Sequence, residues 1–283
     1  MSLIEQKYKY NQVIVSIVGY GDNLKIRVVQ LKTLRMSGVE DEDDKGMIIS
    51  ELGQINDTKL EESIRRSKRK IYEYAICNPW DFFFTGTLDK EKYDRSDLEK
   101  YHKDLTQFFR DYKKKYGVYI EFLLIPELHK DRKSWHIHGF IHGLPSEHLI
   151  QFKKGDKIPK AIAEKVKNCE TVYKWIDYQK KFGWNSLEPI KSHEAVSKYI
   201  TKYINKDLAK SVTELNAHLY YHSRGLNVAK KISQGTIIDG ITYTGLYMKD
   251  KKIKMDTYSN EYCSIVTVDY NEETLNNILE QIY

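Results

Sequence analysis

Short apolar runs alternate with longer amphipathic stretches along the chain, a pattern typical of strands interspersed with helices. Runs rich in β-branched and aromatic residues predict strands at 12–18, 24–31, 80–88, 118–126, 135–143 and 171–178. Apolar residues at three- and four-residue spacings predict helices over 58–75 and 96–116, and a short helix is expected near 146–152. Ser192, with Glu194 in the first turn, predicts the start of another helix.

This order of elements predicts an α+β fold with a central antiparallel sheet and helices packed on one face, of ferredoxin-like or RNA-recognition-like type. Residues 218–226 are expected to add a strand to that sheet. We expect four regions, namely an N-terminal β-rich accessory region, a basic helix, a core domain and a C-terminal extension, at 1–57, 58–77, 78–225 and 226–283.

Composition excludes several classes of protein. The 283 residues are enough for one large domain or two modest ones. Cys77, Cys169 and Cys263 lie far apart without a CxxC pair, which argues against a disulfide framework or a thiolate zinc site and favours a reducing compartment such as the cytosol. An N-terminal apolar signal and a long uncharged apolar run are both missing, so neither secretion nor membrane spanning is indicated.

The net charge of +6 is modest, but basic residues are concentrated in the predicted helix at 58–75. Five cations occupy six positions there: Arg65, Arg66, Lys68, Arg69 and Lys70. Such clusters neutralise DNA phosphates and release counterions, although a merely solvated basic face is an equally good interpretation. Residues 249–254 form another basic patch, and the acidic run 40–44 is most simply a solvated loop. The 22 tyrosines suit either stacking on unpaired bases or packing in a sheet.

Candidate metal ligands gather in the predicted hairpin around residues 127–139. His136 and His138 alternate along one strand, so their side chains should share a face and could bind one cation. Glu127, near the end of the preceding strand, is the expected third ligand, and His129 is the alternative. A His-x-His pair alone is weak evidence, because two ordinary hydrogen-bonded histidines give the same pattern.

The helix expected from Ser192 contains a second reactive group. Tyr199 and Tyr203 are four residues apart and share a face, and Lys202 neighbours Tyr199. A tyrosine hydroxyl that faces a metal site can attack a phosphodiester and displace the 3′ oxygen, while the metal polarises a non-bridging oxygen. The lysine can offset charge in the transition state or ease loss of the phenol proton.

Three motifs, in this order, resemble those of the HUH (His-hydrophobic-His) endonucleases, and within them the replication initiator (Rep) proteins of rolling-circle plasmids and phages. The motifs are Phe84–Leu88, His136–His138 and Val196–Lys202, and the resemblance covers about residues 78–210. The chain departs from the first motif at Gly86, where the family has an apolar residue. This departure leaves the packing of that strand open but removes no reactive group.

The resemblance implies that Tyr199 is the nucleophile, that Lys202 supports the chemistry, and that His136, His138 and Glu127 bind Mg²⁺ or Mn²⁺. Tyr203 would be a second nucleophile, as in family members that use two tyrosines, or would pack or contact DNA. Lys198, inside the third motif, is expected to contact DNA together with the cations of the basic helix. The endonuclease domain would be the core domain at 78–225.

The function implied by the resemblance is initiation of rolling-circle replication in the cytoplasm of a bacterial host, by sequence-specific nicking and joining of single-stranded DNA through a 5′-phosphotyrosine link. The expected partners are single-stranded or hairpin origin DNA and, because the sequence has no GxxxxGK[ST] phosphate loop, a host helicase and polymerase. Two alternatives remain: a relaxase or transposase with the same chemistry, and a non-catalytic module that binds single-stranded nucleic acid without a metal.

Overall fold

The computed structural model describes residues 9–36, 57–129, 131, 133–205, 208–209, 211, 218–237, 255–259 and 263–280. It divides into two compact units, one formed by residues 51–227 and the other by residues 1–50 together with 228–283. The acidic run 40–44 and the basic patch 249–254 lie outside the described residues. None of the helices in the described ranges has both the length and the apolar character needed to cross a membrane.

The unit that contains both chain ends is built on an antiparallel sheet, with five strands in the described ranges, in the order β10-β1-β2-β12-β11. These strands are β1 (Lys9–Val18), β2 (Lys25–Met36), β10 (Lys230–Ile237), β11 (Met255–Ser259) and β12 (Cys263–Asp269). Helix α7 (Glu272–Leu279) contributes Ile278 to a core with Val13, Val15 and Ile26. The predicted N-terminal hairpin is confirmed, but its pairing with strands from the far end of the chain was not predicted.

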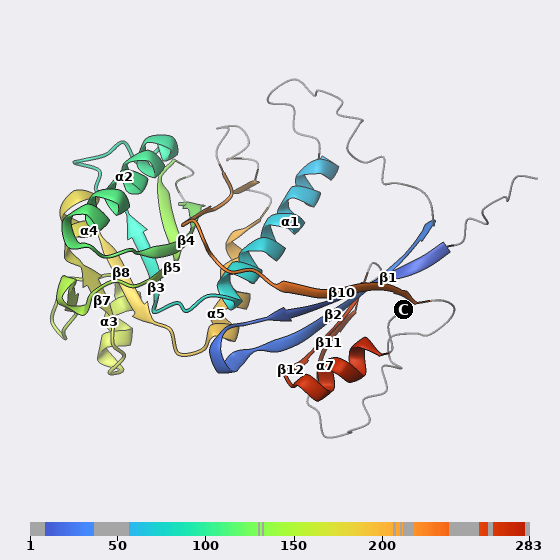
Figure 1. The fold of residues 1–283 in the computed structure, drawn as a ribbon. Coiled ribbons are helices and arrows are strands. Elements are labelled where there is room, and N and C mark those ends of the chain that lie inside the picture. Colours follow the sequence, from blue (N-terminus) through green and yellow to red (C-terminus); the bar gives the residue numbers. More distant parts are fainter. Residues whose placement is uncertain are drawn as a thin grey trace, which may run out of the picture. The chain divides into compact units, whose positions relative to one another are not determined.

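The unit at 51–227 holds a second antiparallel sheet, with seven described strands in the order β6-β7-β8-β3-β5-β4-β9 (Figure 1). The strands are β3 (Phe82–Thr87), β4 (Glu121–Leu128), β5 (Trp135–His142), β6 (Leu149–Gln151), β7 (Tyr173–Trp175), β8 (Asn185–Pro189) and β9 (Tyr221–His222). The helices that accompany them are α1 (Asp57–Ile76), α2 (Leu98–Tyr116), α3 (Lys160–Lys167), α4 (Ile176–Lys181) and α5 (His193–Ile200). The predicted α+β class is confirmed.

Helices cover both faces of this sheet, and the prediction of helices on one face was wrong. Leu123 and Ile125 of β4 pack in a core with α1 and α5, whereas Leu124, between them, packs in a core with α2 and α4. Figure 1 shows the two pairs of helices on opposite sides of the strands. The reason is visible in β4 itself, where consecutive apolar residues leave hydrophobic surface on both faces, so both must be covered.

Helix ends follow the local sequence. Helix α2 begins after Asp97, whose carboxylate accepts a hydrogen bond from the Lys100 N–H, and it ends at Gly117 in the left-handed conformation, φ 71°. Helix α5 begins after Ser192, as predicted, and the Ser192 hydroxyl accepts a hydrogen bond from the Ala195 N–H. The α-helix stops at Ile200 and continues as a 3₁₀ turn, η4 (Thr201–Tyr203), which places the second tyrosine of the motif on the turn.

Three local predictions were wrong. The segment 171–178 is the short strand β7 followed by helix α4, and 146–152 is a 3₁₀ turn (Ser146–His148) followed by strand β6. Strand β8 was not predicted, because only Leu187 is strongly apolar among its five residues. The missed strand matters for the fold, since β8 lies directly beside β3.

Gly86 is required by a close approach between β3 and helix α4. A Cβ atom at this position would lie 2.5 Å from the Tyr178 hydroxyl oxygen and 2.8 Å from Phe84 Cζ. The Tyr178 hydroxyl, which is hydrogen-bonded to Tyr101 in the core, therefore occupies the space that an apolar side chain would fill. The departure from the family's first motif thus coincides with a packing change on the face opposite the histidines.

Candidate active site

The neighbouring strands β3, β5 and β4 place the predicted metal ligands on one face of the sheet. Thr87 is paired with His136 and Thr85 with His138, while Glu127 on β4 is also paired with His136. Residues directly opposite each other in an antiparallel pair point to the same face. The prediction that His136 and His138 share a face is therefore confirmed, and Glu127 lies across the hairpin at their level.

Two threonines of the first motif orient the two imidazole rings. Thr85 Oγ1 lies 3.1 Å from His138 Nδ1, and Thr87 Oγ1 lies 3.2 Å from His136 Nδ1. With Nδ1 engaged in each ring, Nε2 is the nitrogen left for another partner, and such outer contacts fix ring orientation in metal sites. The sequence motif included these threonines, but reasoning from the sequence gave them no role.

His136 has the properties of a free ligand. Its Nε2 atom is buried and has no hydrogen-bond partner among the described residues. Burial, followed by the nearby His129 and His138, lowers the pKa of His136 to about 4, so the ring is neutral at neutral pH. A neutral imidazole with an unpaired nitrogen is the form that binds a divalent metal, so this part of the site fits a cation.

Glu127 makes the closest contact to the histidine pair. Its Oε2 lies 2.6 Å from His138 Nε2, and this hydrogen bond is the main cause of the lowered pKa of Glu127. Among the described residues, no three His, Cys, Asp or Glu side chains converge closely enough to hold a metal ion as they stand. The donors fit a cation chemically, but metal binding would have to displace the proton shared between Glu127 and His138.

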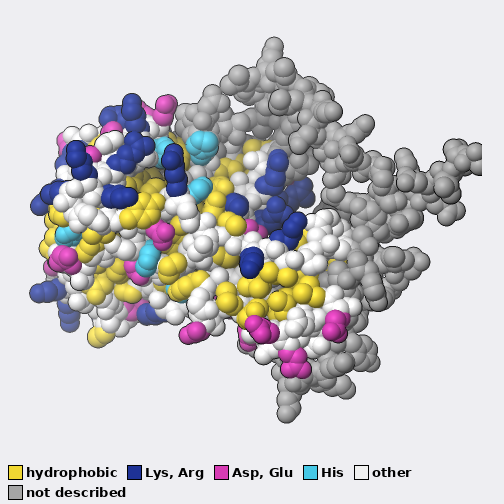
Figure 2. Space-filling view, in the orientation of Figure 1, with side chains coloured by type: hydrophobic (Ala, Val, Ile, Leu, Met, Phe, Trp, Pro, Cys, Tyr) yellow, Lys and Arg dark blue, Asp and Glu magenta, His cyan; other side chains and the backbone are white. Residues whose placement is uncertain are grey.

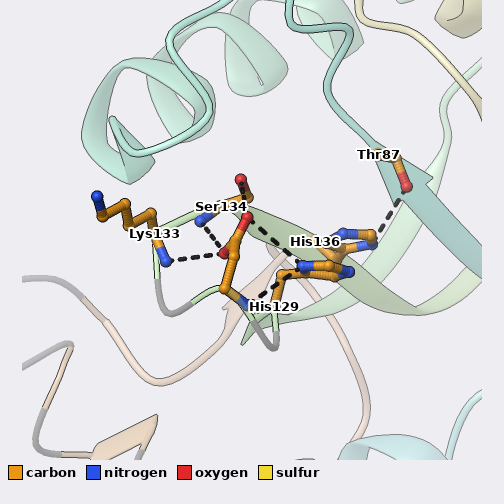
Figure 3. A network of polar contacts seen from close by, with 6 residues as sticks. Thr87, His129, Lys133, Ser134 and His136 are labelled. Atoms are coloured by element: carbon orange, nitrogen blue, oxygen red, sulfur yellow. Dashed lines mark hydrogen bonds and ion pairs between the residues drawn. The ribbon is translucent and has the colours of Figure 1, made fainter.

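His129, the alternative third ligand, stacks on His136 with ring centroids 4.9 Å apart and an interplanar angle of 11° (Figure 3). Its Nδ1 lies 3.5 Å from Asp131 Oδ2. The Asp131 carboxylate accepts hydrogen bonds from the Lys133 and Ser134 N–H groups, which hold the turn and lower the pKa of Asp131. The position of His129 is thus set by the turn between β4 and β5, and its side chain is exposed.

The tyrosine pair adjoins the histidine pair. The Tyr199 and Tyr203 hydroxyl oxygens are 3.2 Å apart, and the Tyr203 ring stacks on His138 with centroids 4.6 Å apart and an angle of 12°. Phe83 packs edge-on against Tyr199 at 5.7 Å. Tyr199 is 44% exposed, so its hydroxyl is accessible to a substrate while Tyr203 connects it to the histidines.

The two tyrosines differ in acidity. Burial raises the pKa of Tyr199, but the contacts with Lys202 and Tyr203 outweigh it, so the net shift is downward. Burial and the contact with Tyr199 raise the pKa of Tyr203 far above its ordinary value. The Lys202 ammonium lies 3.3 Å from the centroid of the Tyr199 ring. Tyr199 is therefore the more readily ionised phenol, and Tyr203 retains its proton and can donate it in a hydrogen bond.

The predicted DNA-contacting cations lie on two helices. Arg65, Arg66, Lys68 and Arg69 are exposed on α1 and Lys70 is partly buried, with its ammonium 5.0 Å from the centroid of the Tyr74 ring. Figure 2 shows Lys and Arg side chains gathered over α1 and also over α2. Lys198 is exposed on α5 and paired with Glu194 at 2.8 Å, so its charge is partly offset.

Residues 81–208, less than half of the chain, match a family model described as a replication-associated protein of the ORF2 type. The matched segment begins just before β3 and includes both histidines and both tyrosines of the site. Comparison with curated proteins and with solved structures gave no significant match. The family match supports a replication initiator that binds DNA.

Proposed function

We propose that a chain with this match to replication-associated proteins starts rolling-circle replication, as an HUH-type enzyme that nicks and rejoins single-stranded DNA through a tyrosine. The observation that supports this most strongly is the placement of Tyr199. Its accessible hydroxyl contacts Tyr203, which stacks on His138, on the same sheet face as His136 and Glu127. A reactive phenol and a cluster of metal-ligand side chains, from segments about sixty residues apart, thus meet at one place.

His136, His138 and Glu127 would hold Mg²⁺ or Mn²⁺, because two imidazoles and a carboxylate suit such ions at a phosphate site. We prefer Glu127 to His129 as the third ligand, since Glu127 already contacts His138. A bound divalent ion would supply positive charge that polarises a non-bridging oxygen of the scissile phosphate.

In the proposed reaction, the Tyr199 oxygen attacks the phosphorus and the bond to the 3′ oxygen breaks. The 3′ oxygen leaves as a hydroxyl after taking a proton, and the 5′ phosphate remains bound to Tyr199. Lys202 favours the ionised form of Tyr199, because its ammonium lies next to the ring. The phosphotyrosine link retains the energy of the phosphodiester, so a 3′ hydroxyl can reverse the reaction without a nucleotide cofactor.

Tyr203 acts in this proposal as a support for Tyr199. Its raised pKa keeps it protonated, so its hydroxyl can donate a hydrogen bond to the Tyr199 oxygen as negative charge develops there. Its stacking on His138 holds it in place. We therefore expect Tyr203 to affect the rate without being the nucleophile of the first nick.

DNA outside the nick would contact the basic surface of α1. Ser63 and Ser67 of α1 line a cleft of about 880 Å³, whose other walls include Arg110, Lys113 and Arg224. The described residues that line it include no carboxylate, so its charge suits a phosphate backbone. Strand separation and synthesis would be carried out by a host helicase and polymerase.

The experiment is to incubate the protein with Mn²⁺ and single-stranded circular DNA of the replicon that encodes it, and to separate covalent protein–DNA adducts under denaturing conditions. We expect wild type and Tyr203→Phe to form an adduct, the variant more slowly, and Tyr199→Phe to form none. Equal cleavage by wild type and Tyr199→Phe would refute the assigned nucleophile. Binding without cleavage by wild type would instead favour a non-catalytic nucleic-acid-binding module.

A further inference from the structure

A cleft of about 730 Å³ opens directly beside Tyr199, between helix α5 and the segment that follows α3. We infer that this cleft binds the base of one unpaired nucleotide next to the scissile phosphate and so determines which sequence is cut. The inference rests on the proposed function, because it takes the substrate to be single-stranded DNA attacked by Tyr199. It adds a specificity site whose residues lie outside the histidine and tyrosine cluster.

One wall of the cleft is apolar and includes Phe83, Ile190 and Val196. Phe83 also packs against Tyr199, so this wall continues from the ring of the nucleophile into the cleft. A flat unpaired base can lie against such a surface, and stacking of this kind contributes substantially to binding of single strands. A strand whose phosphate reaches the Tyr199 hydroxyl therefore has its neighbouring base at the mouth of the cleft.

The opposite wall is polar but has no excess charge. Glu188 is paired with Lys165, and Glu170 is paired with Lys191 at 3.3 Å. All four side chains line the cleft, together with Asn168 and Thr171. Paired charges of this kind do not favour a phosphate, which needs a net positive surface. They do offer hydrogen-bond donors and acceptors to the edge of a base, as amide and carboxylate side chains do in base recognition.

Size and position point to the same occupant. The volume lies in the range of pockets that enclose a small ligand, and it is open to solvent beside the exposed Tyr199 ring. An unpaired base, flat and uncharged with a polar edge, matches one apolar wall and one neutral polar wall. The cleft thus reads sequence, while the basic surfaces elsewhere on this unit bind backbone.

Asn168→Trp tests the assignment, because Asn168 is exposed at the end of α3 and a large side chain there would fill the cleft from the wall opposite Tyr199. Ala163→Trp is the matched control, since Ala163 is exposed on the same helix but does not line the cleft. The probe is an oligonucleotide library that spans the mapped nick, with the positions on either side randomised. Covalently captured products of each protein are sequenced to give the base preference at every position.

We expect wild type and Ala163→Trp to share a strong preference at one position beside the nick, and Asn168→Trp to lose it at that position alone. With the preferred base, the KM of Asn168→Trp should rise on the order of tenfold, the scale of one lost stacking contact. The inference is overturned if wild type shows no preference beside the nick, or if folded Asn168→Trp keeps it. If wild type does not cleave, the proposed function fails. The same library is then selected by binding to each protein, and an unchanged preference in Asn168→Trp overturns the inference independently.

Discussion

Removal of the two threonine hydroxyls that contact the histidines should loosen the metal site without unfolding the protein. Thr85 and Thr87 lie 3.1 and 3.2 Å from the Nδ1 atoms of His138 and His136, and valine has the same shape but cannot make these contacts. Loss of an outer contact of this kind typically weakens metal affinity about 10- to 100-fold. We expect each of Thr85→Val and Thr87→Val to raise the dissociation constant for Mn²⁺ by about that factor.

The assay is titration of Mn²⁺ followed by electron paramagnetic resonance of the free ion, with urea unfolding of the same samples. A histidine nitrogen left without its partner should also cost roughly 1–3 kcal/mol of stability for each threonine. Thr106→Val is the matched control, because Thr106 Oγ1 lies 3.3 Å from His102 Nε2 on α2, outside the site. A folded Thr85→Val/Thr87→Val protein that binds Mn²⁺ as tightly as wild type would refute the assignment of these threonines.

Three further predictions follow from the packing and charges. Gly86→Ala should destabilise the protein by about 1–3 kcal/mol in urea unfolding, because the new Cβ would lie 2.5 Å from the Tyr178 hydroxyl oxygen; unchanged stability would contradict this packing. Lys202→Met should move the pH profile of single-turnover cleavage to higher pH, since the phenolate attacks and Lys202 lowers the pKa of Tyr199; Lys160→Met, on exposed α3, should leave it unchanged. Replacement of Arg66, Lys68 and Arg69 by Gln should reduce the salt dependence of single-strand binding by about 2 in the slope of log K against log salt, and an unchanged slope would exclude α1 as a phosphate contact.

The elements predicted correctly are those whose signals are local. Helix α2 has apolar residues at helical spacing over its whole length, an N-cap at Asp97 and a glycine at its end, and all of these can be recognised without knowledge of the fold. The shared face of His136 and His138 follows from strand geometry alone. The contact between Tyr199 and Tyr203 follows from their spacing of four, even though the α-helix gives way to a 3₁₀ turn between them.

The parts that sequence could not give depend on partners distant in the chain. Strand β8 is joined to β7 through the Asn185 side chain, which bonds both the N–H and the C=O of Trp175, and no periodic pattern signals such a contact. The pairing of β1 with β10 likewise joins opposite ends of the sequence. The roles of Thr85 and Thr87 became clear only from their register with β5.

The most direct test of the proposed chemistry is to locate the phosphodiester bond between protein and DNA. Wild-type protein would be trapped with its nicked DNA, digested with protease and nuclease, and the modified peptide sequenced by mass spectrometry. We predict a nucleotide attached through its 5′ phosphate to Tyr199. Attachment at another residue, or complete cleavage with no protein-linked nucleotide, would contradict the account.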